Sequence, residues 1–197
     1  MLLKGRVGAS DKPRRPQTGA VVVDLLRELL TAAGLGAPYV LVGQGLGGVY
    51  ANLYARRHPS EVAAVVLVEP THPDDDVDER LLRFLPRSSI WAGSRRGWRR
   101  HAEQHNLAET RREIEQAGPF PGVPLTVVSG SRTAPRLTTS PRQIRTRSVR
   151  RKELVTLSPD NRHLLAPSSG QFPQVTDPQI VVRAVREIIA PWTGSPE

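Results

Sequence analysis

Cysteine is absent from this sequence of 197 residues, and only 5% of the residues are aromatic. Without cysteine, disulfide bonds and thiolate metal sites are excluded. Long hydrophobic runs are also missing. The longest apolar stretches, such as residues 62–68, are far shorter than the roughly 20 residues that a membrane-spanning helix needs. Lys4 and Gly5 come before a signal-peptide core could form, so we expect a cytoplasmic protein that does not cross a membrane.

Lysine is scarce too, because only Lys4, Lys12 and Lys152 accompany the arginines among the 28 basic residues. The formal net charge is nevertheless +9. The densest basic cluster, residues 132–152, holds no aromatic side chain on which bases could stack. Without such groups, the attraction between arginine and a polyanion is unspecific. We therefore interpret this cluster as a solvated basic loop and expect no nucleic-acid partner.

Hydrophobic periodicity divides the chain into alternating helices and strands. Thr18 is a suitable cap for the first helix, and Gly34 follows its end. The β-branched run 62–68 is typical of a parallel strand that is buried on both faces. The last helix is expected to end before Pro191. These patterns predict helices over 19–33, 49–57 and 180–189, and strands over 39–42, 62–68, 124–128 and 163–166.

Two segments lack this alternation. Residues 71–121 are rich in arginine, aspartate and glutamate. We expect them to form a helical insertion, a cap or lid, within a single domain of residues 1–197. Sheet character is lost again across residues 129–150. The order of elements is that of an α/β protein with a mostly parallel sheet, flanking helices and a helical cap.

A glycine-rich turn, residues 43–48, joins a strand to a helix, which is where α/β sheets bind ligands or present nucleophiles. Its pattern Gly43-x-Gly45-x-x-Gly48 satisfies the dinucleotide-binding fingerprint. Glu69, after the next strand, is placed to bind ribose hydroxyls. The same pattern also arises wherever a tight turn must bring a strand and a helix close together. A dinucleotide-binding protein is therefore one interpretation of this turn.

A second interpretation comes from the wider sequence. Residues 39–59, YVLVGQGLGGVYANLYARRHP, and 61–74, EVAAVVLVEPTHPD, strongly resemble the α/β-hydrolase family around its nucleophile elbow. The segments GRVGASD at 5–11 and SPDNRHLLAPSSGQF at 158–172 are similar to the family's sequence before the elbow strand and around its catalytic histidine. The resemblance covers most of the chain outside the insertion, whereas the fingerprint covers only its centre. It implies an α/β-hydrolase-like fold of esterase-like ancestry.

The same resemblance implies that the catalytic positions are degenerate. Gly45 stands where the Gly-x-Ser-x-Gly motif of the family has its nucleophilic serine, and Gln171 stands where a histidine is the general base. Glycine carries no nucleophile, and the amide of glutamine cannot take up a proton near neutral pH. Glu69 fits the position that some members use for the acid, although a carboxylate that binds nearby backbone N–H groups is an equally good interpretation. The Leu46 N–H would supply one oxyanion donor.

We therefore expect an α/β-hydrolase-fold protein without ordinary serine-hydrolase activity, which either binds a small acyl or ester-like ligand, binds a protein partner, or is a decayed relative of the family. Gln44 at the turn, and Trp91 and Trp98 on a lid helix, are the candidate ligand contacts. The alternatives are an active carboxylic-ester hydrolase that uses a non-standard route, such as water activated by Glu69, and the dinucleotide-binding protein. No cofactor and no metal ion are expected, because the histidines come without the acid motif of a metal site.

The resemblance also implies that the chain is short at its amino end, because the family's strands before the elbow strand have no counterpart here. Residues 39–42 would then form an exposed apolar edge of the sheet. Such an edge is a template for pairing with another chain. We therefore expect self-association through this strand.

Overall fold

The computed structural model describes residues 17–74, 107–131 and 141–194. The chain divides into two compact units. Residues 1–35 and 73–116 form the first unit, and residues 36–72 and 117–197 form the second. All strands of the described residues belong to the second unit, which therefore holds the sheet and the glycine turn.

The first unit contributes two described helices, α1 (Gly19–Ala32) and α5 (Leu107–Gln116). Thr18 caps α1 as the sequence predicts, because its hydroxyl accepts a hydrogen bond from an N–H of the first turn at 3.4 Å. The Gly19 N–H donates to the hydroxyl of Thr110 on α5 at 2.8 Å. The N–H groups that a helix start leaves without intrahelical partners are thereby bound by side chains.

The second unit is built on four parallel strands in the order β1-β2-β3-β4. Their bounds are β1 (Tyr39–Gln44), β2 (Val62–Val68), β3 (Leu125–Gly130) and β4 (Asn161–Ala166). The predicted strands are confirmed. Nearly every residue of β2 and β3 is buried, which explains the continuous apolar run of β2. Within the described sheet, β1 has one neighbouring strand, and its Val42 is 53% exposed.

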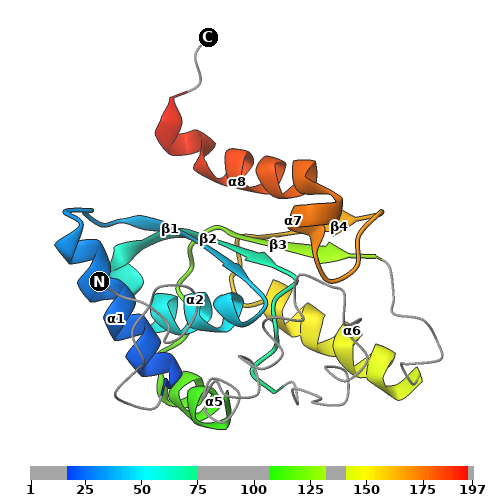
Figure 1. Ribbon diagram of the computed structural model, residues 1–197, viewed down its shortest axis with the longest axis horizontal. Coiled ribbons are helices and arrows are strands. Elements are labelled where there is room, and N and C mark those ends of the chain that lie inside the picture. Colours follow the sequence, from blue (N-terminus) through cyan, green and yellow to red (C-terminus); the bar gives the residue numbers. More distant parts are fainter. Residues whose placement is uncertain (1–16, 75–106, 132–140, 195–197) are drawn as a thin grey trace, which may run out of the picture. The chain divides into compact units, whose positions relative to one another are not determined.

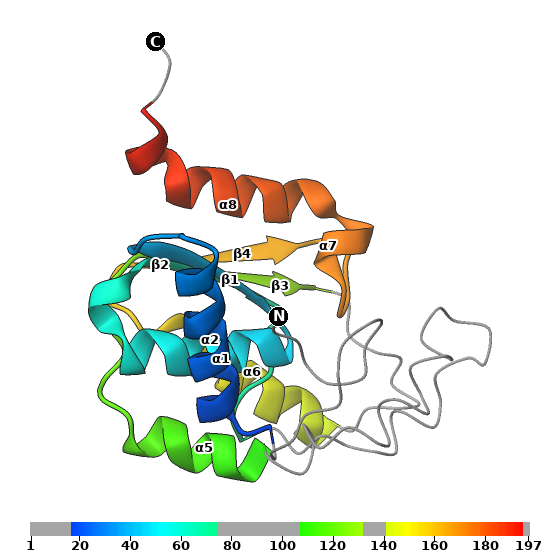
Figure 2. The same cartoon turned by 60° about the vertical axis from the view of Figure 1, so that its left-hand side comes forward.

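Helices cover both faces of this sheet (Figure 1, Figure 2). α8 (Pro178–Thr193) packs against β2 and β3 on one face, while α2 (Leu46–Arg57) and α6 (Pro141–Val155) lie on the other. The short helices η1 (Pro59–Glu61) and α7 (Pro173–Thr176) precede β2 and α8. Each strand is parallel to the next, through crossovers that include β1-α2-β2 and β3-α6-β4, so the carboxyl ends of all four strands meet at one edge of the sheet.

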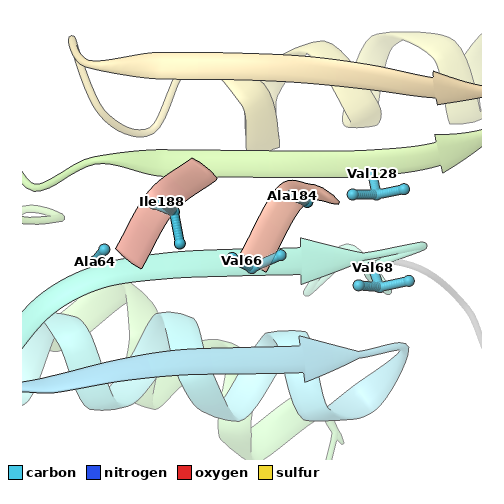
Figure 3. Packing of buried hydrophobic residues seen from close by; sticks show 6 residues of the cluster. All are labelled: Ala64, Val66, Val68, Val128, Ala184 and Ile188. Carbon is cyan, nitrogen blue, oxygen red and sulfur yellow. The ribbon is translucent and has the colours of Figure 1, made fainter. Parts of the chain in front are cut away.

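Small and β-branched side chains form the core between α8 and the sheet (Figure 3). None of the six residues at its centre is more than 7% exposed. They are Ala64, Val66 and Val68 of β2, Val128 of β3, and Ala184 and Ile188 of α8. Because alanine lies on both the strand and the helix, the two backbones can approach closely. The predicted amphipathic helix near the end of the chain is thus confirmed.

The prediction of a basic loop across residues 132–152 is wrong for the part that the structure describes, because residues 141–155 form helix α6. Apolar side chains are few in this segment, so hydrophobic periodicity gives no helical signal. The arginine, glutamine, lysine and glutamate residues that fill it are nevertheless good helix formers, and Pro141 suits the first position of a helix. Leu154, which is 4% exposed, anchors the helix.

Two helix ends differ from the prediction as well. α2 begins at Leu46 rather than at residue 49, because the chain enters the helix directly after the sharp turn at Gly45. α8 continues through Pro191 to Thr193 instead of ending before the proline. Pro191 lies in the last turn of the helix, where the loss of its N–H removes at most one helical hydrogen bond.

The expected cap over residues 71–121 falls largely outside the described residues. Residues 75–106, with Trp91 and Trp98, are not among them, so both tryptophans remain predicted ligand contacts. The part of the segment that the structure describes includes α5, which is helical as expected.

Candidate functional site

The chain turns sharply at Gly45, between β1 and α2. The residue has φ 54° and ψ −121°, a conformation that is strained for any residue with a Cβ atom. Its N–H donates to the Val68 carbonyl at 3.2 Å. Its carbonyl accepts from the N–H groups of Gly48 at 3.0 Å and of Thr71 at 3.1 Å. Backbone hydrogen bonds thus hold the turn, with no side chain needed at Gly45.

Close packing of backbone explains the other glycines of the turn. A Cβ atom on Gly43 would lie 2.5 Å from the Gly47 carbonyl oxygen, and one on Gly48 would lie 3.0 Å from the Cβ of Pro70. A Cβ on Gly45 would meet only the Thr71 hydroxyl, at 4.0 Å, among the described residues. Space for a side chain therefore exists at Gly45, and it is the backbone conformation that opposes one.

The two residues beside Gly45 lie in regular elements rather than in the predicted turn of residues 43–48. Gln44 ends β1 with an exposed side chain, and Leu46 is the half-buried first residue of α2. Gly45 has no side chain to cap α2. The Leu46 N–H therefore stands at an uncapped helix start, where the helix favours negative charge. The role of the Leu46 N–H as an oxyanion donor stays a prediction.

Glu69 follows β2 at the same edge of the sheet, with a φ of 41°. Its carboxylate accepts a hydrogen bond from the Gly130 N–H and lies 3.4 Å from Nη2 of Arg151. The side chain is 17% exposed. Burial raises the pKa of Glu69, although the hydrogen bond from Gly130 and the charges of Arg151 and Arg147 lower it in part. These contacts are those expected of a carboxylate that binds a nearby backbone N–H.

The raised pKa of Glu69 predicts a pH dependence of stability. The folded state holds the Glu69 proton more tightly than the unfolded state, so the contribution of this group is greatest in acid and declines as pH rises from the ordinary pKa, 4.5, through the raised one. Chemical denaturation across this window is expected to show this decline in the wild type and not in Glu69→Gln.

Glu187 on α8 supplies a control, because its contribution to stability is expected to change with pH in the opposite direction. Its pKa is lowered, first by a hydrogen bond from Arg183 at 2.7 Å, so its stabilising contribution is lost as pH falls. Glu187→Gln is therefore expected to change the pH dependence in the other direction. Indistinguishable pH profiles for the wild type and Glu69→Gln would contradict the burial of a charged Glu69.

Gln171 lies in the loop between β4 and α7, and its side chain is exposed. The loop approaches the end of β3 so closely that a Cβ atom on Gly130 would lie 2.2 Å from the Gly170 carbonyl oxygen. Ser169 anchors it, because its fully buried hydroxyl lies 2.6 Å from that of Thr176. The structure thus brings the Gln171 loop to the strand end that binds Glu69. No described contact joins Gln171 to Gly45.

Sequence reasoning missed the polar residues that α6 and the loop after β2 bring to this edge. His72 Nε2 lies 3.2 Å from Oε2 of Glu153, and the His72 side chain is 14% exposed. Arg151 reaches Glu69 from the same helix. Because the sequence predicts no helix over residues 141–155, it gives no indication of either contact. The spacing of Arg147 and Arg151, four residues apart, places them on one side once the segment is known to be helical.

A sequence profile of the alpha/beta hydrolase fold matches residues 7–120, more than half of the chain. The chain belongs to the α/β hydrolase fold family. Solved structures agree on the fold of this chain. An esterase from Thermogutta terrifontis is 20% identical with a TM-score of 0.57, and the match covers 91% of this chain and 75% of the esterase chain. A probable hydrolytic enzyme from Pseudomonas aeruginosa is 20% identical with a TM-score of 0.62, and the match covers 90% of this chain and 71% of that enzyme chain.

Curated relatives are much longer than this α/β hydrolase-fold chain. An uncharacterized protein of Schizosaccharomyces pombe is 48% identical over 81 residues, which are 40% of this chain and 15% of that protein. An uncharacterized vacuolar membrane protein of Saccharomyces cerevisiae is 31% identical over 80 residues, 40% of this chain and 12% of its own length. Among the described helices, none has the length and apolar character that crossing a membrane requires. The cytoplasmic location stays a prediction.

Proposed function

We propose that this α/β hydrolase-fold chain binds a small acyl or ester-like ligand at the Gly45 turn and does not carry out ordinary serine hydrolysis. The conformation of Gly45, with φ 54° and ψ −121°, is the observation that carries the proposal. It is the sharp strand-to-helix turn that presents the nucleophile in Gly-x-Ser-x-Gly elbows, yet the residue has no hydroxyl. The exposed Gln171 amide cannot act as a general base.

Polar groups around the turn support a ligand-binding role. The uncapped start of α2 presents the Leu46 N–H, and the Thr71 hydroxyl lies 4.0 Å from the position that a Cβ of Gly45 would take. Both groups can donate a hydrogen bond to a carbonyl oxygen. An ester or acyl group placed against Gly45 would therefore be held by donors and would meet no nucleophile at that residue.

The test measures hydrolysis and binding on the same sample. With p-nitrophenyl acetate, the purified chain is expected to match a heat-killed control. Methyl butyrate is expected to raise the melting temperature, because a ligand that binds only the folded state stabilises it. Turnover well above the control, retained after contaminating enzymes are removed, would contradict the proposal, as would the absence of any thermal shift.

Two alternatives can be tested with the same sample. Water activated by Glu69 would give turnover that Glu69→Gln abolishes. Dinucleotide binding would give a thermal shift with NAD or NADP. The Glu69 carboxylate, which would hold the ribose in that case, is already bound by the Gly130 N–H and Arg151. Its contacts therefore do not favour the dinucleotide alternative.

Gly45→Ser is expected to lower the free energy of unfolding by about 2 kcal/mol, because a residue with a Cβ atom is strained at this φ and ψ. No esterase activity should appear, because Gln171 still stands at the base position. Gly47→Ser is a matched control in the same turn, since Gly47 has no positive φ and a Cβ there meets nothing described within 4 Å. A higher melting temperature for Gly45→Ser would contradict the strained turn.

We also propose that copies of the chain associate through β1. This strand has one neighbour in the described sheet, and its Val42 is 53% exposed, so its edge and side chain can pair with another chain. Light scattering is expected to give a mass above the 21.7 kDa of one chain as concentration rises.

Val42→Lys should shift this equilibrium toward the monomer, because a lysine on an edge strand opposes pairing. Val182→Lys, at a 40% exposed position of α8, should leave it unchanged. A monodisperse wild-type monomer at high concentration would refute association through β1.

A further inference from the structure

One side of α6 is basic and faces the carboxyl edge of the sheet. Arg147 and Arg151 are four residues apart on this helix, so their side chains lie on the same side. Nη2 of Arg151 lies 3.4 Å from Oε1 of Glu69, and the charge of Arg147 acts on the same carboxyl group. Arg151 therefore contacts this carboxylate, and Arg147, one helical turn away on the same side, adds a second positive charge, so the three groups together carry positive charge in excess.

Among the residues that the structure describes, the neighbouring titratable groups do not remove this excess. Glu153 is the sole acid in the sequence of α6, and its carboxylate lies 3.2 Å from His72 Nε2. His163 on β4 brings no negative charge, and burial together with Arg151 lowers its pKa. Arg147 is exposed and Arg151 is 33% exposed, so both can be reached from solvent.

The basic side of α6 is connected to the Gly45 turn through the loop of residues 69–72. Glu69 at the start of this loop contacts Arg151, and His72 at its end contacts Glu153. Between them, the Thr71 N–H donates to the Gly45 carbonyl at 3.1 Å. A small molecule placed at the Gly45 turn therefore lies beside this loop and the helix that packs on it.

We infer that the ligand of this chain carries a carboxylate, which binds Arg147 and Arg151 while the acyl or ester group lies at the Gly45 turn. The inference rests on the proposed function and adds the charge of the ligand. A planar carboxylate matches the fork of N–H donors on a guanidinium group. A nucleic acid is the competing partner of a basic helix, but it would use the exposed Arg145 as readily as Arg147.

Two methyl esters test the inference by isothermal titration of the full chain at low salt. Monomethyl succinate carries a carboxylate, and methyl butyrate has a methyl group in its place. We expect monomethyl succinate to bind roughly tenfold more tightly, the gain of a charge-assisted hydrogen bond. Arg147→Gln should remove this advantage. Arg145→Gln, a change of the same charge at an exposed position of the same helix, should keep it.

Glu69→Gln is expected to strengthen the binding of monomethyl succinate, whereas Arg147→Gln weakens it. This variant removes the carboxylate that competes for Arg147 and Arg151, while its amide oxygen can still accept from the Gly130 N–H. We expect it to bind monomethyl succinate roughly threefold more tightly than the wild type, and the gain should shrink as salt is added. A merely structural role of Glu69 would not produce tighter binding.

Equal affinity for the two esters would overturn the inference and leave the proposed function standing, because methyl butyrate would still bind. If neither ester bound, the inference and the proposed function would both fail. Equal losses from Arg147→Gln and Arg145→Gln would also overturn the inference. So would an oligonucleotide that binds through both arginines and displaces monomethyl succinate, since this is the behaviour of unspecific polyanion attraction.

Discussion

Gly130→Ala is expected to lower the free energy of unfolding by about 3 kcal/mol, the upper range for an overpacked interior site. The new Cβ would lie 2.2 Å from the Gly170 carbonyl oxygen and 2.5 Å from that of Ser169. Both oxygens belong to backbone, so no side chain can rotate away to make room. Either β3 or the loop that carries Gln171 must move, which also disturbs the hydrogen bond from the Gly130 N–H to Glu69.

Chemical denaturation of the wild type and two variants checks this expectation. Gly122→Ala is the control, because a Cβ at Gly122, in the loop before β3, meets no described atom within 4 Å. That control should change the free energy of unfolding by no more than about 1 kcal/mol, because alanine only lowers the conformational entropy of the unfolded chain. Similar stabilities for the two variants would show that the loop accommodates a methyl group against β3.

Gly43→Ala is expected to have an effect of similar size, about 3 kcal/mol, and to act on the turn itself. Its Cβ would lie 2.5 Å from the Gly47 carbonyl oxygen and 2.7 Å from the Gly48 nitrogen. Both atoms are backbone of the first turn of α2, so the helix start must move away from β1. Because this movement displaces the Leu46 N–H, the thermal shift with methyl butyrate should be lost together with stability.

Gly47→Ala is the matched control for this variant. A Cβ at Gly47 meets no described atom within 4 Å, and the residue lies within α2. Alanine is favoured over glycine in a helix by roughly 0.5–1 kcal/mol, so the control should raise stability. The two alanine variants, four residues apart, are thus expected to change the melting temperature in opposite directions. Unchanged or raised stability of Gly43→Ala would contradict the close approach at Gly43.

The strands could be predicted because their signal is local. β2 is a continuous run of alanine, valine and leucine that has few alternatives to a buried parallel strand. α6 could not be predicted, because its side chains are mostly polar or charged and only Leu154 among those described is buried. Such a helix is held by contacts to distant residues rather than by an apolar stripe. The first turn of α2 could not be predicted for another reason, because Gly47 and Gly48 are poor helix formers that packing keeps helical.

The candidate site also combines residues that a local motif could place with contacts that it could not. Gln44, Gly45 and Leu46 are consecutive, so a local motif could place them at a strand-to-helix turn. Arg151 and Glu69, by contrast, are 82 positions apart in the sequence. Their meeting depends on the crossover β3-α6-β4, and no pattern within either segment indicates it. Resemblance to a family identifies the positions of its catalytic residues, but it does not identify polar contacts that belong to this chain.

The Thr71 amide hydrogen, which is bound to the Gly45 carbonyl, can exchange with deuterium only when this hydrogen bond opens. His72 follows directly and contacts Glu153 of α6, so the loop that binds the turn also borders this helix. The exchange rate of the Thr71 amide therefore measures how often the hydrogen bond between this loop and the Gly45 turn opens. A ligand that bridges them would slow that rate, and the slowing could be followed by NMR without any assay of turnover.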